Sequence, residues 1–199
     1  MLCPVVFLGA GPSRRARRGG LDIAGLTAGS YSLPGSGNLA GVGTLSGSGK
    51  SLTVPGAFTP GDPFAFGNSP STVTLGSGLS LDLSQSGSSV FEITDPAFTA
   101  GTYDLVSGSG SVVLGGILNL DFSGGTYATG ANVQIFANTG GRSGNFSAVN
   151  FTGLAADQSA TFNPATGFIS VVPEPSTCAS LLAGLACGGY MRFRRRRAR

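Results

Sequence analysis

Glycine is the feature of this chain that most limits its fold, since it fills 34 of 199 positions. A glycine inside a helix costs about 1 kcal/mol relative to alanine, and Ser and Thr, which are also abundant, favour caps, turns and strands. The hydrophobic content of 41% is nevertheless that of a globular protein. Together these facts predict an all-β fold rather than a helical or a disordered chain.

Short apolar runs separated by Gly, Ser, Asn and Pro support this prediction. Two of them, 79–83 and 118–122, alternate apolar and polar residues, which is the pattern of a half-buried strand. The spacing of the runs fits either a β-solenoid or a β-sandwich such as a jelly roll, and periodicity alone does not choose between them. The predicted strands are 73–75, 79–83, 90–93, 103–106, 111–114, 117–122 and 133–136.

Charge is divided between the ends and the body of the chain. The basic residues cluster at 14–18 and 192–199, whereas positions 19–172 contain two basic and eight acidic residues, a net charge of −6. A nucleic-acid-binding domain needs basic side chains spread over a folded face. We therefore expect no nucleic-acid partner.

The residue types also restrict the chemistry. The chain has no His, which excludes Ser-His-Asp and Cys-His catalysis and every imidazole metal ligand. The segment 47–51 ends like a phosphate-binding Gly-Lys-Ser loop, but the first Gly of that motif is Thr44, so we interpret it as a Ser/Gly corner. Asp82, Asp104 and Asp121 are candidates for glycoside hydrolysis if they stack, although isolated acids on a solvent face usually only keep a protein soluble. We predict no catalytic residue, metal site or cofactor.

Segment 1–20 is atypical for the start of an exported protein. An export signal runs from a basic region to an apolar region, whereas here the apolar stretch 2–10 precedes the arginines at 14–18. We interpret segment 1–20 as the result of a start codon assigned at the wrong place. The body of the protein then begins at residue 21.

The chain ends in three consecutive features. Segment 171–176 contains Pro173, Glu174 and Pro175, which form a stiff extended break. Residues 177–191 carry no charge, and this run is short for a helix that spans a membrane. It reaches the lower limit when Phe193 is included and the long arginine side chains extend to the membrane interface, so we predict a short transmembrane helix over segment 177–193. Segment 192–199 keeps this end in the cytoplasm through its arginines. These are Arg192, Arg194, Arg195, Arg196, Arg197 and Arg199.

The sequence Val-Pro-Glu-Pro-Ser at 172–176, an apolar helix and a terminal Arg cluster resemble the PEP-CTERM protein-sorting signal. The resemblance implies export across the inner membrane of a Gram-negative bacterium, with the tail as a transient anchor. It also implies that an exosortase, a membrane-embedded enzyme, recognises Pro173, Glu174 and Pro175 and cleaves nearby. The protein is then delivered to the cell surface or to an extracellular matrix that often contains exopolysaccharide.

The body, 21–170, is similar in the order of its motifs to the last rungs of an autotransporter passenger domain. This resemblance implies a small right-handed parallel β-helix, and the prolines of the sorting motif, with the irregular stretch before them, are expected to stop further strand addition. The motifs that carry it are 58–62, 73–76, 79–83, 103–120 and 143–146.

These features predict a non-enzymatic surface or matrix protein with a structural or adhesive role. A face of Ser, Thr and Asn side chains is expected to contact exopolysaccharide or copies of the same chain. The alternative is a carbohydrate-active β-helix enzyme that uses Asp82, Asp104 or Asp121.

Overall fold

The computed structural model describes residues 5–8, 19–61, 70–123 and 125–173. All regular elements in these ranges are strands, which confirms the all-β prediction. The strands are β1 (Val5–Leu8), β2 (Gly19–Asp22), β3 (Ser30–Ser32), β4 (Asn38–Gly41), β5 (Gly43–Ser46), β6 (Ser51–Thr53), β7 (Ala57–Pro60), β8 (Thr72–Leu75), β9 (Ser80–Asp82), β10 (Ser88–Ile93), β11 (Leu105–Gly108), β12 (Ser111–Leu114), β13 (Ile117–Phe122), β14 (Asn132–Gln134), β15 (Arg142–Gly144), β16 (Ala148–Thr152), β17 (Gln158–Asn163) and β18 (Phe168–Pro173).

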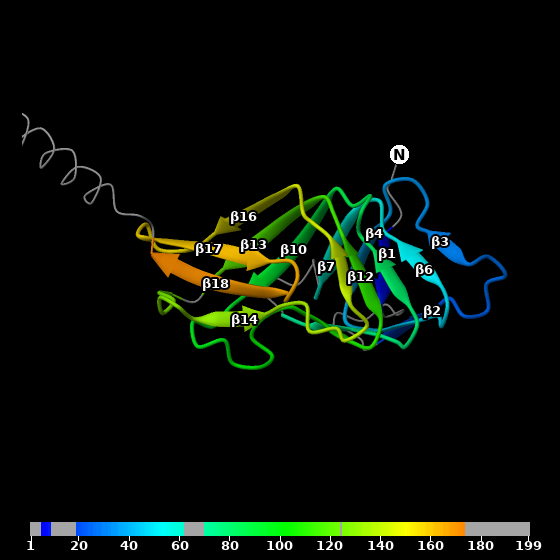
Figure 1. Cartoon of the computed structure of the whole chain (residues 1–199), viewed down its shortest axis with the longest axis horizontal. Coiled ribbons are helices and arrows are strands. Elements are labelled where there is room, and N and C mark those ends of the chain that lie inside the picture. The colour runs from blue at the N-terminus through cyan, green and yellow to red at the C-terminus, as the bar shows by residue number, and fades with distance from the viewer. Residues whose placement is uncertain (1–4, 9–18, 62–69, 124, 174–199) are drawn as a thin grey trace, which may run out of the picture.

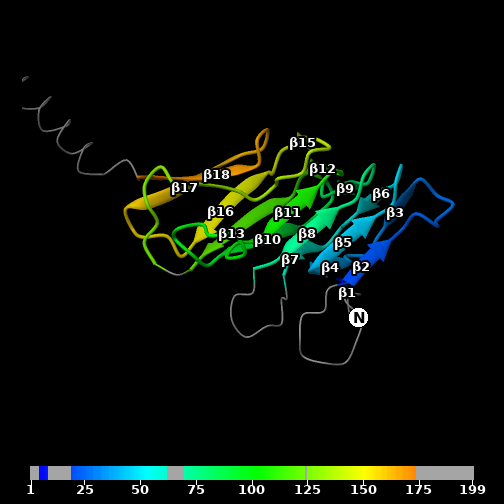
Figure 2. The ribbon, with the colours of Figure 1, turned by 90° about the horizontal axis from the view of Figure 1, so that it is seen from below.

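The strands coil into a parallel β-solenoid with three sheets (Figures 1 and 2). Sheet A has the order β1-β4-β7-β10-β13-β16, sheet B has β11-β8-β5-β2, and sheet C has β15-β12-β9-β6-β3. Each sheet takes every third strand, so the chain visits A, B and C in turn and then repeats. This arrangement confirms the β-solenoid, and the β-sandwich alternative is wrong.

Strand register gives the length of one rung of the coil. Thr53 of β6 pairs with Asp82 of β9, which lies 29 residues later in the sequence. Thr74 of β8 pairs with Ser107 of β11, which lies 33 residues later. In this part of the molecule, two side chains stack on the same face only when their separation in the sequence is close to these values.

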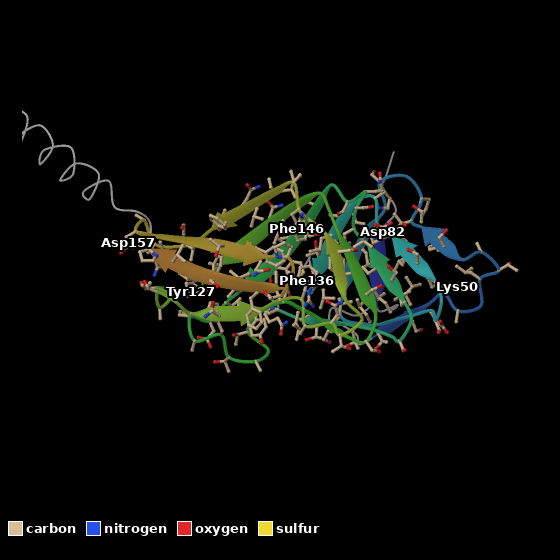
Figure 3. All side chains as sticks on the ribbon, viewed as in Figure 1. Lys50, Asp82, Tyr127, Phe136, Phe146 and Asp157 are labelled. Carbon is tan, nitrogen blue, oxygen red and sulfur yellow. The ribbon has the colours of Figure 1, made fainter. Side chains whose placement is uncertain are left out.

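The core is the inside of the coil, where alternate residues of each strand point. In β10 and β13, every second side chain is buried. Aromatic rings continue from rung to rung, since Phe91 lies between Phe58, at a centroid distance of 6.1 Å, and Phe136, at 5.0 Å. Phe146 packs on Phe136 at a centroid distance of 6.2 Å, so the apolar core continues toward the C-terminal end. Figure 3 labels both residues on the ribbon.

Corners between the sheets depend on glycine. At Gly116, between β12 and β13, φ is +70° and an added Cβ would lie 1.9 Å from the carbonyl oxygen of Ser86 in the preceding rung, so no other residue fits there. The predicted corner at 47–51 is confirmed: the Lys50 amide donates to the Gly47 carbonyl at 2.9 Å, between β5 and β6. The abundance of glycine thus has a structural cause.

The C-terminal end of the coil is closed by an antiparallel sheet, sheet D, with the order β14-β18-β17. The Ile135 amide donates to the Gly167 carbonyl at 3.0 Å, which joins the last rung to the turn between β17 and β18. The expectation of an irregular stretch before the sorting motif is wrong, because strands fill 158–163 and 168–173. A regular hairpin, rather than the prolines alone, ends the solenoid.

The sequence-predicted tail falls almost entirely outside the described residues. Pro173 is the last residue of β18 and is exposed, whereas Glu174, Pro175, the predicted helix 177–193 and the arginines of 192–199 are not described. Most of segment 1–20 also lies outside them. In the ranges that the structure does describe, no helix is long and apolar enough to cross a membrane.

Candidate binding face

The three aspartates named as candidates for catalysis do not come together. Asp82 points outward from β9 in sheet C, where it accepts a hydrogen bond from Thr53 Oγ1 at 3.3 Å. Asp121 points outward from β13 in sheet A, and Asp104 is buried. Their separations in the sequence do not match the length of a rung, so they cannot stack.

Asp104 belongs to the internal architecture, so the expectation that it lies on a solvent face is wrong. Its side-chain oxygens accept the backbone N–H of Ser71 at 2.7 Å and that of Glu92 at 2.9 Å. The strand β7 pairs with β10 only at Ser88 and Ser89, and beyond that point the Asp104 side chain accepts the hydrogen bond of the Glu92 amide. The carboxyl group thus links the start of β8 to β10.

Burial raises the pKa of Asp104 to about 8, although the two N–H donors favour the ionised form and lower it. The nearby Glu92 charge adds a smaller upward contribution. The carboxyl is therefore largely protonated in the folded protein at neutral pH. Because it is fully buried and bonded to backbone, it cannot touch a substrate.

The two described basic side chains are also used by the fold. Arg142 Nη1 donates to the carbonyls of Phe136 at 2.9 Å and Asn138 at 3.0 Å, and its Nη2 donates to the carbonyl of Ala165 at 3.1 Å. Lys50 Nζ donates to the Ala28 carbonyl at 3.0 Å. Arg142 thus ties the last rung to sheet D.

Tyr127 is a second buried polar residue near that end. Its hydroxyl donates to the Ile93 carbonyl at 2.8 Å, and the Ser123 carbonyl also lies within hydrogen-bonding distance. Burial raises the pKa of Tyr127 to about 12, so the phenol stays neutral. Its ring packs against Phe122 at a centroid distance of 5.0 Å. This environment indicates a packing role.

The outer face of sheet A over β10, β13 and β16 carries apolar, amide and acidic side chains in separate rows. The strands β10 and β13 have six residues each and run in register over that whole length, so three outward rows form. We call these nine side chains the sheet A grid. The rows are Ser88, Ile117 and Ala148; Val90, Asn119 and Asn150; and Glu92, Asp121 and Thr152.

Cross-strand hydrogen bonds fix the two polar rows of the sheet A grid. Asn150 Nδ2 donates to Asn119 Oδ1 at 3.0 Å, and Thr152 Oγ1 donates to Asp121 Oδ1, also at 3.0 Å. Beside these rows, Ile117 is 37% exposed, so an apolar side chain borders the amides. The grid therefore offers an apolar margin, an amide row and an acidic row in parallel.

Sheets B and C have narrower outer faces. Their strands are three or four residues long, and their outward side chains are mainly hydroxyls. Thr74 and Ser107 face each other across β8 and β11 of sheet B, with their oxygens 3.5 Å apart. Sheet C carries one row of stacked serines at Ser30, Ser51, Ser80 and Ser111.

Sequence reasoning named Asp121 but missed its neighbours in the grid. Glu92 and Asn150, which complete the rows of Asp121 and Asn119, each lie one rung away in the sequence. The sequence signal that identifies them is the recurrence of similar residues at a spacing of one rung. In the described part of the chain, no three His, Cys, Asp or Glu side chains come together as metal ligands would.

Comparisons with known proteins add nothing to this geometry: no family model, no curated protein and no solved structure matches the chain. The class of protein defined by the fold is a small all-β solenoid with a differentiated polar face.

Proposed function

We propose that the chain is an exported surface or matrix protein that carries a PEP-CTERM-type sorting tail. The observation that carries the proposal is the order of the Pro-Glu-Pro motif, the apolar segment 177–193 and the Arg cluster 192–199. In this proposal the segment 177–193 spans the inner membrane, the arginines stay in the cytoplasm, and an exosortase recognises Pro173, Glu174 and Pro175.

The end of the folded body supports this proposal. The strand β18 ends at Pro173, whose side chain is exposed, so the first residue of the motif is accessible at the end of the folded body. The arginine-poor, acidic body is also compatible with translocation, because the positively charged residues that oppose transfer lie at the ends.

The proposed role of the body outside the cell is structural or adhesive rather than enzymatic. Asp82 and Asp121 face outward from different sheets and Asp104 is buried, so these residues form no pair of carboxylates around a substrate. A rigid solenoid with hydroxyl, amide and carboxylate side chains outside suits contact with exopolysaccharide or with other copies of the chain.

The intact mass of the protein recovered from producing cells and from their medium tests the sorting proposal. We expect the native protein to lose its tail and the variant with Pro173→Ala, Glu174→Ala and Pro175→Ala to keep it. A variant with Asn163→Ala in β17 is the matched control, since it alters the last hairpin but leaves the motif intact, and it should be processed like the native protein. If the tail persists in the native protein, exosortase processing is refuted.

A further inference from the structure

We propose that the sheet A grid binds a neutral polysaccharide. This inference rests on the proposed function only in placing the protein outside the cell, beside such polymers. The site itself consists of the outward side chains of β10, β13 and β16.

The chemistry of the grid matches that of a sugar chain. A pyranose ring has apolar C–H faces and a rim of hydroxyls that both donate and accept hydrogen bonds. The grid sets the exposed Ile117 in the row beside Asn119 and Asn150, whose amides donate and accept, and Val90 adds an apolar side chain at the end of that amide row. Asn119 and Asn150 lie on neighbouring strands, about 4.8 Å apart, so two amide side chains stand side by side along the direction that crosses the strands.

The polar side chains of the grid are held in place before any ligand arrives. The bond between Asn150 and Asn119 and the bond between Thr152 and Asp121, both 3.0 Å long, fix four side chains across β13 and β16. A side chain that becomes immobilised only when the ligand binds loses conformational entropy, and that loss lowers the affinity. Side chains that are already held avoid this loss. The Asn119 amide nitrogen and the Asn150 amide oxygen keep hydrogen-bonding capacity beyond their mutual bond.

Charge selects a neutral polymer over an anionic one. Glu92 and Asp121 lie next to each other in register, and none of the nine residues of the grid is basic. The body as a whole carries a net charge of −6 between residues 19 and 172. A polyuronate or a sulfated glycan is therefore repelled where it passes over the grid, with a strength that falls as salt is added.

The faces of sheets B and C fit a polysaccharide less well. Their described strands give at most two outward rows. The exposed aromatic side chain of sheet C, Tyr31, lies on the edge strand β3 and pairs in register with the buried Leu52, so it is not part of an outward row. Thr74 and Ser107 nevertheless form a cross-strand pair of the same kind as Asn119 and Asn150. This pair supplies a matched control on a different face.

The test measures binding of the detergent-solubilised full chain to three neutral polysaccharides, dextran, galactomannan and mixed-linkage β-glucan, and to anionic polygalacturonate. We expect at least one neutral polymer to bind about tenfold more tightly than polygalacturonate at low salt. The variant Asn119→Ala with Asn150→Ala should lose about tenfold in affinity, as should Ile117→Asp, whereas Thr74→Ala with Ser107→Ala should change it less than about twofold. Thermal unfolding of each variant confirms that it is folded.

Three results would overturn the proposal: no binding of any neutral polymer, tighter binding of polygalacturonate, or an equal loss in the sheet B control. The sorting proposal fails separately. If the tail is not processed but the grid variants lose affinity, the export route is wrong and the binding site stands.

Discussion

Replacement of Asp104 by Asn should reverse the order of stability of the two proteins as the pH rises. Asn keeps the shape of the neutral carboxyl. In the native protein, however, both side-chain oxygens of Asp104 accept hydrogen bonds from backbone N–H groups, those of Ser71 and Glu92, and the amide nitrogen of Asn must face one of these donors. Leaving that N–H without an acceptor costs about 1 to 3 kcal/mol. At pH 4 the variant should therefore be less stable than the native protein by about that amount.

The pH dependence of the native protein follows from the raised pKa. Asp104 has a pKa of about 8 in the fold against 3.8 ordinarily, so the folded state binds its proton more tightly than the unfolded state. Its contribution to stability is complete below pH 3.8 and is lost as the pH rises through about 8. A difference of about four pH units corresponds to about 5 kcal/mol. Above pH 8 the Asp104→Asn variant should be the more stable protein.

The assay is urea unfolding of both proteins from pH 4 to pH 9, with the difference in free energy plotted against pH. The chain has no His, so the usual side chain that titrates near neutrality does not interfere. The variant Asp121→Asn, on the outer face, is the control and should retain the native pH dependence. If the native protein and Asp104→Asn give parallel curves, burial does not govern this carboxyl and the reasoning is refuted.

Two further substitutions, each with a control, test the closed end and the corner. Arg142→Met removes the donor to three backbone carbonyls between the last rung and sheet D, and should lower the free energy of unfolding by about 3 kcal/mol. Its control, Lys50→Met, removes an exposed contact and should lower that free energy by less than about 1 kcal/mol in the same urea titration. Gly116→Ala places a Cβ against a backbone carbonyl at φ +70° and should lower the stability by at least about 2 kcal/mol in thermal unfolding. Its control, Gly25→Ala, has nothing within 4 Å of the added Cβ and should change the stability by less than about 0.5 kcal/mol; equal effects of the two would contradict the corner geometry.

Much of the fold follows from the sequence because strand periodicity is a local property. The predicted strands 111–114 and 117–122 coincide with β12 and β13, and 90–93 lies within β10. The predicted strand 103–106 begins too early, because Tyr103 and Asp104 pair back antiparallel on β10 before β11 starts at Leu105. The turn that reverses the chain here is a tertiary feature that alternation does not reveal.

The candidate site was less accessible to sequence reasoning, since it depends on register between strands that lie a whole rung apart in the sequence. Asp104 reads as a polar strand residue, yet it is buried because β7 ends before β10 does and leaves a backbone amide to be satisfied. Asn119 and Asn150 read as unrelated strand residues, yet they meet because one rung separates them. Neither relation is visible before the rung length is known.

The most direct test of the whole account is the fraction of tail-free protein that sediments with the extracellular matrix of producing cells. We expect the native protein and the variant Asn119→Ala with Asn150→Ala both to be processed, the native protein to sediment with the matrix, and the variant to pass into the medium. Equal retention of the two proteins would contradict the role of the sheet A grid. Native protein that stays in the cell with its tail would contradict the account at its first step.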